Sequence, residues 1–382
     1  MGIAGCGNGK NSRPFGARRQ RRKTILAHGG RGWLIVRMQT KTPTSTSKFL
    51  TQILCLTAFA LIAPPRSAFA LTIPLDNSSG QVFALDAARH FLYTGEQFGP
   101  GGTKHLDVIN TLTNTVVGNF SFSAGGYSSQ LATSGTNVFW ADQGSSLVRA
   151  ISVNAAGVPS ATRNDSMTLA TGIAALPGTY GVSLQGTGDI MRIVNSSTGS
   201  ILQTVNLGGV ASIMSSDPLS SLYYVRSNVI DVKVINLGGV IVRPLTGTVC
   251  AIDSAVAHHF VYFENGSNTQ VLTQLNGSDD SSTGKSFDFG AGATITNVTV
   301  DAATGNIWTS LQAQSRVVEL DSNMNFIQQF TVPNAEAIAF DNGSAYVHEA
   351  GTNLVAVVPE PSALAFLASV SATLLGLRRR RA

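Results

Sequence analysis

A two-strand pattern recurs roughly every 40 residues along the middle of the chain, which is the period of a propeller blade. In each copy an apolar strand, often ending in Asp, precedes a turn and a second strand that mostly carries an aromatic residue. No other feature limits the fold as strongly. The seven copies are Gln81–Asp86 with Phe91–Tyr93, Gln130–Thr133 with Val138–Trp140, Gly172–Leu176 with Tyr180–Val182, Ala211–Met214 with Leu222–Tyr224, Val249–Asp253 with Phe260–Tyr262, Val298–Asp301 with Ile307–Trp308, and Ala337–Asp341 with Ala345–Val347.

Each copy continues with two more strand-like runs, as in the sixth, where Arg316–Leu320 and Phe326–Phe330 flank a polar turn. Four antiparallel strands make one blade. The seventh copy ends after Asn353–Val357 with only three strands, so we expect Leu71–Leu75 to supply the fourth and close the ring. The near absence of helical periodicity agrees with this. The prediction is an all-β propeller of seven four-stranded blades over residues 71–357. Six or eight blades remain open, because glycines blur the third copy.

The blade rhythm resembles that of the YVTN-type propellers of microbial surface proteins and the wider NHL and lactonase-like group. The resemblance covers most of residues 71–357 but contains no diagnostic motif. It implies the propeller fold and little about activity, because propellers have binding, enzymatic and structural roles alike.

Residues 38–70 have the parts of a secretory signal peptide. Lysines precede the short apolar run Phe49–Ala63, and Ala68 and Ala70 form a small-x-small cleavage site. We therefore expect cleavage before Leu71. Residues 1–37 then either precede the true translation start or extend the basic N-terminal region of the signal peptide.

Residues 358–382 form a tripartite tail. Pro359, Glu360 and Pro361 come first, and the uncharged run Ser362–Leu377 follows, enough for about 24 Å of helix. This predicts a transmembrane helix slightly shorter than a bilayer core of about 30 Å. Four arginines then end the tail, and positive flanks stay on the cytoplasmic side. They are Arg378, Arg379, Arg380 and Arg381.

This tail resembles the PEP-CTERM sorting signal of Gram-negative bacteria. The resemblance implies export, transient anchoring in the inner membrane, and cleavage near the Pro-Glu-Pro motif by a membrane-embedded exosortase. It also implies a final location at the cell surface or outside the cell. Both prolines favour extended backbone, so we expect the peptide at Pro359 and Pro361 to be open to a processing enzyme. An ordinary membrane anchor that is never cut is the alternative.

The charge is unevenly distributed. The residues before Leu71 include twelve Lys/Arg and no Asp/Glu. Residues 71–357 hold ten Lys/Arg and twenty Asp/Glu, a net charge of about −10. A nucleic-acid partner is therefore not expected for the body, since such partners require a basic surface.

Metal-dependent catalysis is the main enzymatic hypothesis. Neither a Gly-x-Ser-x-Gly elbow nor a His-Glu-x-x-His pair occurs in the sequence. The lactonase-like resemblance implies a Glu, Asn and Asp cluster around a divalent metal in the channel. Glu336 and Asn297 stand at inner-strand starts, with Asp253 at the other end of its strand, and they are the candidate ligands for Ca²⁺ or another divalent cation. The absence of a cofactor is the favoured alternative.

Three further features have simpler interpretations. His258 and His259 are adjacent, so on a strand they would point to opposite faces, and we expect turn residues rather than metal ligands. Asp321 begins an alternating run of oxygen side chains, but the run lacks the Gly and Glu of a calcium loop and fits a capped turn. Cys250 is expected to be a packed thiol.

The sequence thus predicts an exported, exosortase-sorted propeller with a non-catalytic binding or structural role linked to extracellular polysaccharide. Its predicted partners are the secretion machinery, exosortase and the membrane through the tail. The alternative is a metal-dependent, lactonase-like enzyme.

Overall fold

The computed structural model of the chain describes residues 23–29, 32–38, 71–75, 80–96, 102–124, 128–186, 189–228, 231–264 and 270–360. The chain divides into two units, Met1–Arg66 and Ser67–Ala382. The described part of the first unit is an antiparallel hairpin of β1 (Lys23–Gly29) and β2 (Gly32–Met38). It ends where the signal peptide is predicted to begin.

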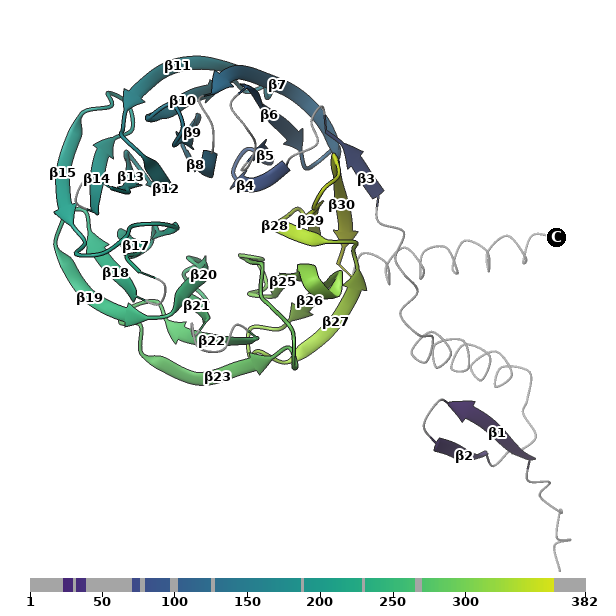
Figure 1. The fold of residues 1–382 in the computed structure, drawn as a ribbon. Helices are drawn as coiled ribbons and strands as arrows, with labels where there is room; N and C mark the ends of the chain where they lie inside the picture. Colours follow the sequence, from purple (N-terminus) through teal and green to yellow (C-terminus); the bar gives the residue numbers. More distant parts are fainter. Residues whose placement is uncertain are drawn as a thin grey trace, which may run out of the picture. The chain divides into compact units, whose positions relative to one another are not determined.

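The second unit contains seven four-stranded antiparallel sheets arranged in a ring (Figure 1), which confirms the predicted all-β, seven-bladed propeller. Blades are numbered here in chain order. Blade 1 is β4 (Gly80–Asp86), β5 (Phe91–Glu96), β6 (Gly102–Asn110) and β7 (Thr115–Ala124); blade 2 is β8 (Ser128–Ser134), β9 (Asn137–Asp142), β10 (Leu147–Val153) and β11 (Pro159–Ser166); blade 3 is β12 (Ala170–Leu176), β13 (Thr179–Leu184), β14 (Ile190–Asn195) and β15 (Ile201–Asn206).

The remaining blades repeat this order from the inner to the outer strand. Blade 4 is β16 (Met214–Asp217), β17 (Leu222–Arg226), β18 (Asp231–Asn236) and β19 (Ile241–Thr246); blade 5 is β20 (Thr248–Asp253), β21 (Phe260–Glu264), β22 (Val271–Asn276) and β23 (Ser282–Asp288); blade 6 is β24 (Asn297–Val300), β25 (Ile307–Leu311), β26 (Arg316–Leu320) and β27 (Phe326–Thr331); blade 7 is β28 (Ala335–Asp341), β29 (Ser344–Glu349), β30 (Leu354–Pro359) and β3 (Leu71–Pro74). A 3-10 turn, η1 (Gln312–Gln314), follows β25.

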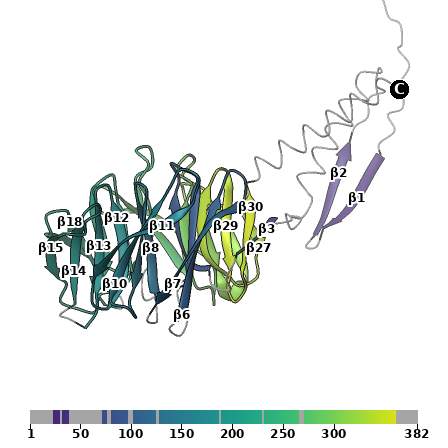
Figure 2. The ribbon, with the colours of Figure 1, turned by 90° about the horizontal axis from the view of Figure 1, so that it is seen from above.

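The first and last described strands of the propeller pair with each other, as the sequence predicts. β3 lies antiparallel to β30, with Leu71 opposite Val357 and Pro74 opposite Leu354. In the edge-on view of Figure 2, β3 and β30 lie side by side in the same blade. The ring therefore closes through a blade built from both ends of the body.

Packing between blades explains one of the glycines that blur the third copy. Gly181 occupies the second strand of blade 3, and a Cβ there would lie 2.5 Å from the Met191 methyl group and 3.1 Å from Tyr223 of blade 4. Elsewhere large aromatic residues fill this layer. Trp308 of blade 6, for example, is fully buried and stacks on Phe340 of blade 7 with ring centroids 5.4 Å apart.

One inner strand differs from its prediction. In blade 4 the sequence predicts Ala211–Met214, whereas β16 spans Met214–Asp217. Backbone hydrogen bonds between Ser212, Ile213 and Arg226 precede the strand, and the Ile213 side chain is exposed. The apolar run thus forms an irregular entry, and the more polar residues after it form the strand.

The structure does not describe residues 361–382, where the predicted transmembrane helix lies. Within the described part of the chain, no helix is both long and apolar enough to cross a bilayer. Pro361, Ala68, Ala70 and the arginine cluster Arg378–Arg381 also lie outside the described residues.

Candidate functional site: the central channel and the seams between blades

A cavity of about 240 Å³ opens at the inner strands of blades 1 to 4. Its lining consists of small, hydroxyl-bearing and aliphatic residues: Ala84, Leu131, Ala132, Thr133, Ile173, Ala174, Ala175, Met214, Ser215 and Ser216. These side chains offer hydroxyl groups and apolar contact, but none is a carboxylate, an imidazole or a cation. The cavity is therefore suited to holding a small neutral molecule or water.

Hydroxyl groups join the inner strands around this cavity. Each donates a hydrogen bond to a main-chain carbonyl of a neighbouring blade. The inner strand of a blade has a strand neighbour on one side only, so its backbone groups on the other side need partners of this kind. These bonds run from Thr133 to Leu85 (3.2 Å), from Ser134 to Leu176 (3.0 Å) and from Ser216 to Ala175 (2.7 Å).

Gln130 joins three blades at once. From the inner strand of blade 2, its Oε1 atom accepts the N–H groups of Ile173 in blade 3 (3.1 Å) and Met214 in blade 4 (3.0 Å). Ile173 and Met214 also line the cavity. Gln130 therefore sets the spacing of the cavity wall.

The three candidate metal ligands are not brought together. Glu336 Oε2 lies 3.1 Å from His348 Nδ1, while Asn297 is exposed at the first residue of β24. Asp253 is the last residue of β20, and because all inner strands run in the same direction it lies at the opposite end from the other two. No group of three His, Cys, Asp or Glu residues in the described ranges could hold a metal ion. The arrangement does not fit the predicted divalent-cation site.

Asp253 instead belongs to the turn that follows it. Its carboxylate accepts the Ala255 N–H at 3.0 Å and lies 3.9 Å from His258 Nδ1. Burial raises the pKa of Asp253, against the lowering effect of the Ala255 hydrogen bond and of His258.

His258 and His259 lie in the turn between β20 and β21, and both N–H groups donate to the Ala255 carbonyl. They contact different acids. His259 Nε2 lies 2.7 Å from Asp217 Oδ2 of blade 4, so it forms part of a seam, the term used here for the contact between two neighbouring blades. This seam explains the pair without a metal.

The same contact recurs where the ring closes. His90 of blade 1 precedes β5 as His259 precedes β21, and its Nδ1 atom lies 2.9 Å from Asp341 Oδ2 of blade 7. Thr111 also donates a hydrogen bond to Asp341. In both seams an Asp at the end of an inner strand meets a His of the next blade. The terminal Asp86 of blade 1 instead pairs with Arg89 of its own blade.

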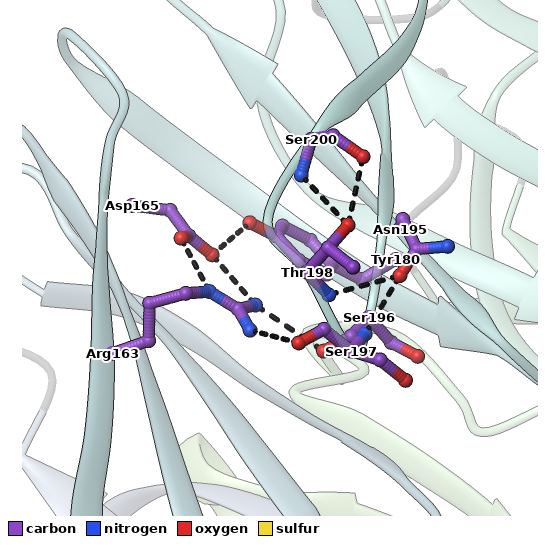
Figure 3. Close-up of polar contacts among 8 residues, drawn as sticks. All are labelled: Arg163, Asp165, Tyr180, Asn195, Ser196, Ser197, Thr198 and Ser200. Carbon is purple, nitrogen blue, oxygen red and sulfur yellow. Dashed lines mark hydrogen bonds and ion pairs between the residues drawn. The ribbon is translucent and has the colours of Figure 1, made fainter.

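A second kind of seam links blades 2 and 3 (Figure 3). Arg163 and Asp165, two residues apart on β11, form a bidentate pair at 2.6 and 2.9 Å. The Tyr180 hydroxyl donates to Asp165 at 2.7 Å, and Arg163 donates to the carbonyls of Ser197 (2.7 Å) and Ser196 (3.2 Å). Burial raises the pKa of Tyr180, and the Asp165 hydrogen bond raises it further.

An equivalent cluster joins blades 4 and 5, where Arg243 pairs with Asp280 and the Tyr224 hydroxyl donates to Asp280 at 3.0 Å. Sequence analysis missed both clusters. The recurrent Tyr of the second strand was a usable signal, because a buried hydroxyl needs a partner. The partner itself comes from another blade and has no fixed spacing.

The run that begins at Asp321 is a capped turn, as the sequence predicts. Asp321 Oδ1 accepts the N–H groups of Asn323 (2.9 Å) and Asn325 (2.8 Å), and Oδ2 accepts the Asn325 amide at 2.9 Å. Partial burial acts to raise the pKa of Asp321, but the hydrogen bonds from Asn325 and Asn323 lower it overall. The carboxylate oxygens are thus engaged within the turn.

The Cys250 thiol is a packed group on β20. Its Sγ atom lies 3.6 Å from the Thr248 carbonyl oxygen, and burial raises the pKa of the thiol. A neutral thiol is a poor nucleophile. This agrees with a packing role.

The two predicted processing points meet in the closing blade. Leu71, the residue after the predicted signal cleavage, is the first residue of β3 and pairs with Val357 of β30. β30 continues to Pro359, two residues beyond the predicted end of the propeller, and the Glu360 N–H donates to the Gly343 carbonyl at 3.0 Å. The start of the motif is therefore extended, as predicted, but it is paired rather than open.

Comparisons with known proteins show the fold and no family. No family model and no curated protein matches the chain. Among solved structures, a chain of the Kuenenia stuttgartiensis hydrazine synthase matches with a TM-score of 0.55 and 11% identity, covering 75% of this chain and 97% of that one. A chain in a crystal structure of a mitotic checkpoint complex matches with a TM-score of 0.59 and 8% identity, covering 78% and 98%. At these identities the likeness supports the propeller architecture alone.

Proposed function

We propose that this chain is an exported propeller of the cell surface or extracellular matrix, sorted by an exosortase, with a non-catalytic binding or structural role linked to extracellular polysaccharide. The observation that carries the proposal is the position of the two sorting signals relative to the fold. The predicted signal peptide ends just before Leu71, the predicted sorting motif begins at Pro359, and these two residues belong to the outer strands of the closing blade. Removal of both ends would leave the ring closed.

The surface and the channel favour binding over catalysis. The body carries a net charge of about −10, and its loops are rich in Ser, Thr and Asn, which form hydrogen bonds with hydrated polymers. The channel cavity is lined by hydroxyl and aliphatic groups. The alternative, a lactonase-like enzyme, requires convergence of Glu336, Asn297 and Asp253, and the arrangement of the inner strands opposes it.

The first test is the intact mass of the full chain expressed in hosts with and without an exosortase. Loss of residues 1–70 and of the tail, dependent on the enzyme, is the expected result. A membrane-bound protein with its complete tail in both hosts would overturn the sorting proposal.

The second test is co-sedimentation of the processed protein with purified extracellular polysaccharide from the same host, with dextran as the control polymer. We expect retention by the host polymer and little retention by dextran. Equal recovery with both polymers would contradict a specific polysaccharide role.

A further inference from the structure

The end of β30 is held by β29, because β3 pairs with β30 only from Leu354 to Val357. β30 lies between β29 and β3, with Val358 opposite Ala345 and Pro359 opposite Ser344 of β29. Val358 is 2% exposed, and Pro359 and Glu360 are half-buried. The first residues of the motif are therefore integral to the closing blade.

Glu360 extends this pairing by one backbone hydrogen bond. Its N–H donates to the Gly343 carbonyl, and Gly343 belongs to the tight turn that connects β28 to β29. Asn342 and Gly343 have φ angles of 49° and 68°, as in the two-residue turns that suit a twisted hairpin. A tight turn of this kind presents its carbonyl group in a defined direction.

The Glu360 side chain is also close to blade 6. Burial raises the pKa of Glu319 on β26, and the negative charge of Glu360 raises it further. Glu319 is itself 1% exposed and accepts hydrogen bonds from Asn306 (2.8 Å) and Gln328 (2.6 Å). The negative charge of Glu360 therefore acts on a buried carboxyl group of blade 6.

We infer that Glu360 is a structural residue of the closing blade and that the sorting enzyme cuts the chain on the C-terminal side of Glu360. This inference rests on the proposed sorting of the chain. Proteases act on locally opened, extended segments, so cleavage at Pro359 or before it would require the end of β30 to separate from β29. Cleavage after Glu360 leaves all described contacts of the blade in place.

The direct test is the C-terminal residue of the processed protein, determined by intact mass and by sequencing of its last peptide. A chain that ends at Glu360 or later supports the inference. A chain that ends at Pro359 or earlier overturns it, although the proposed sorting would then still hold.

Hydrogen exchange on the unprocessed full-length protein tests whether Glu360 belongs to the closing blade, independently of any sorting enzyme. Pro359 and Pro361 carry no amide hydrogen, so a peptide across the motif reports Glu360 without interference from them. Slow exchange at Glu360, within about tenfold of Val357, is the expected result. Exchange at the rate of an unstructured amide would overturn the inference, whether or not the tail is processed.

A pair of glycine substitutions sharpens this measurement. Gly343→Ala places a side chain at positive φ in open space, so it strains the turn without a clash. We expect Glu360 exchange to accelerate several-fold. Gly135→Ala likewise places a side chain at positive φ in open space, in the turn between the first two strands of blade 2, and should leave Glu360 exchange unchanged. Equal Glu360 exchange in both variants would contradict the proposed role of the turn.

Discussion

The closing blade and blade 6 have the same four antiparallel strands, but they hold their outer strands differently. In blade 6 a turn joins β27 to β26, and the strand leaves Phe326 and Ile327 52% and 40% exposed. In the closing blade β3 comes from the other end of the body. It has only four residues, yet Ile73 within it is 3% exposed and Leu75, directly after it, is 4% exposed.

The difference shows how a strand without a covalent turn is held. The entropic cost of closing a loop grows only slowly with its length, so a distant segment can complete a blade. It then depends on buried side chains for its position. Backbone and side-chain bonds between Leu75 and Asn353, at 2.8 and 3.2 Å, align β3 with β30.

The largest expected effect is therefore at Ile73. Ile73→Ala removes a buried side chain from the cluster with Leu92, Val355 and Val357, and should lower the free energy of unfolding by about 3 kcal/mol. Ile327→Ala, on the exposed face of β27, should cost roughly 1 kcal/mol or less. Urea unfolding of both variants measures the difference. Equal losses of unfolding free energy in the two variants would show that the two outer strands are held alike, with or without a turn that joins them to the neighbouring strand.

The Asp–His seams provide the next comparison. Asp217 is fully buried beside His259, whereas Asp341 at the closing seam faces a His90 side chain that is 39% exposed. Asp217→Ala should cost about 2 kcal/mol because it leaves buried donors unpaired. Asp341→Ala should cost about 1 kcal/mol. Thermal unfolding shows which of the two variants loses more stability. A larger loss for Asp341→Ala would mean that ring closure depends on this seam more than the burial of Asp341 implies.

The smallest expected effect is a pH dependence at Glu319, next to the closing blade. Burial, with the charges of Glu360 and Asp301, raises its folded-state pKa, so the protonated form favours folding. The stabilisation from the raised pKa is complete below about pH 4.3, the pKa of Glu in an unfolded chain. It is lost as the pH rises through the raised pKa of the folded state. Relative to Glu319→Gln, the unaltered protein should gain stability between pH 7 and pH 5.

Asp321 is the control of opposite sign. Its lowered folded-state pKa contributes stability that is present above about 3.9 and is lost on further acidification. Against Asp321→Asn, the unaltered protein should therefore lose stability as the pH falls below about 4. Thermal unfolding from pH 3 to pH 8 covers both cases, and a common sign would contradict the assigned causes.

The sequence predicted the blades well because their signals are local. Alternation, turn residues and the second-strand aromatics repeat within each unit, so even β26 was predicted with its observed bounds, Arg316–Leu320. The prediction was wrong at the inner strand of blade 4, where the apolar Ala211 and Ile213 precede the strand and do not form it. Ala211 is buried there among its neighbours, whereas the Ile213 side chain is exposed.

The candidate sites were less predictable. Glu336, Asn297 and Asp253 were chosen from their places along inner strands, but strand direction separates Asp253 from the other two. Gln130 and the Arg163 cluster carried no sequence signal of comparable strength. Their partners lie 43 to 84 and 15 to 34 residues away, at separations that do not recur between blades.

By itself the sequence indicated seven blades, with six or eight left open, and determined their four-strand order and the closure of the ring by β3, because hydrophobic periodicity and turn chemistry act within short segments. Only the tertiary structure decided which polar groups meet across the seams and that Pro359 and Glu360 belong to the closing blade. Those contacts join residues far apart in the chain, and their geometry exists only once the ring has closed.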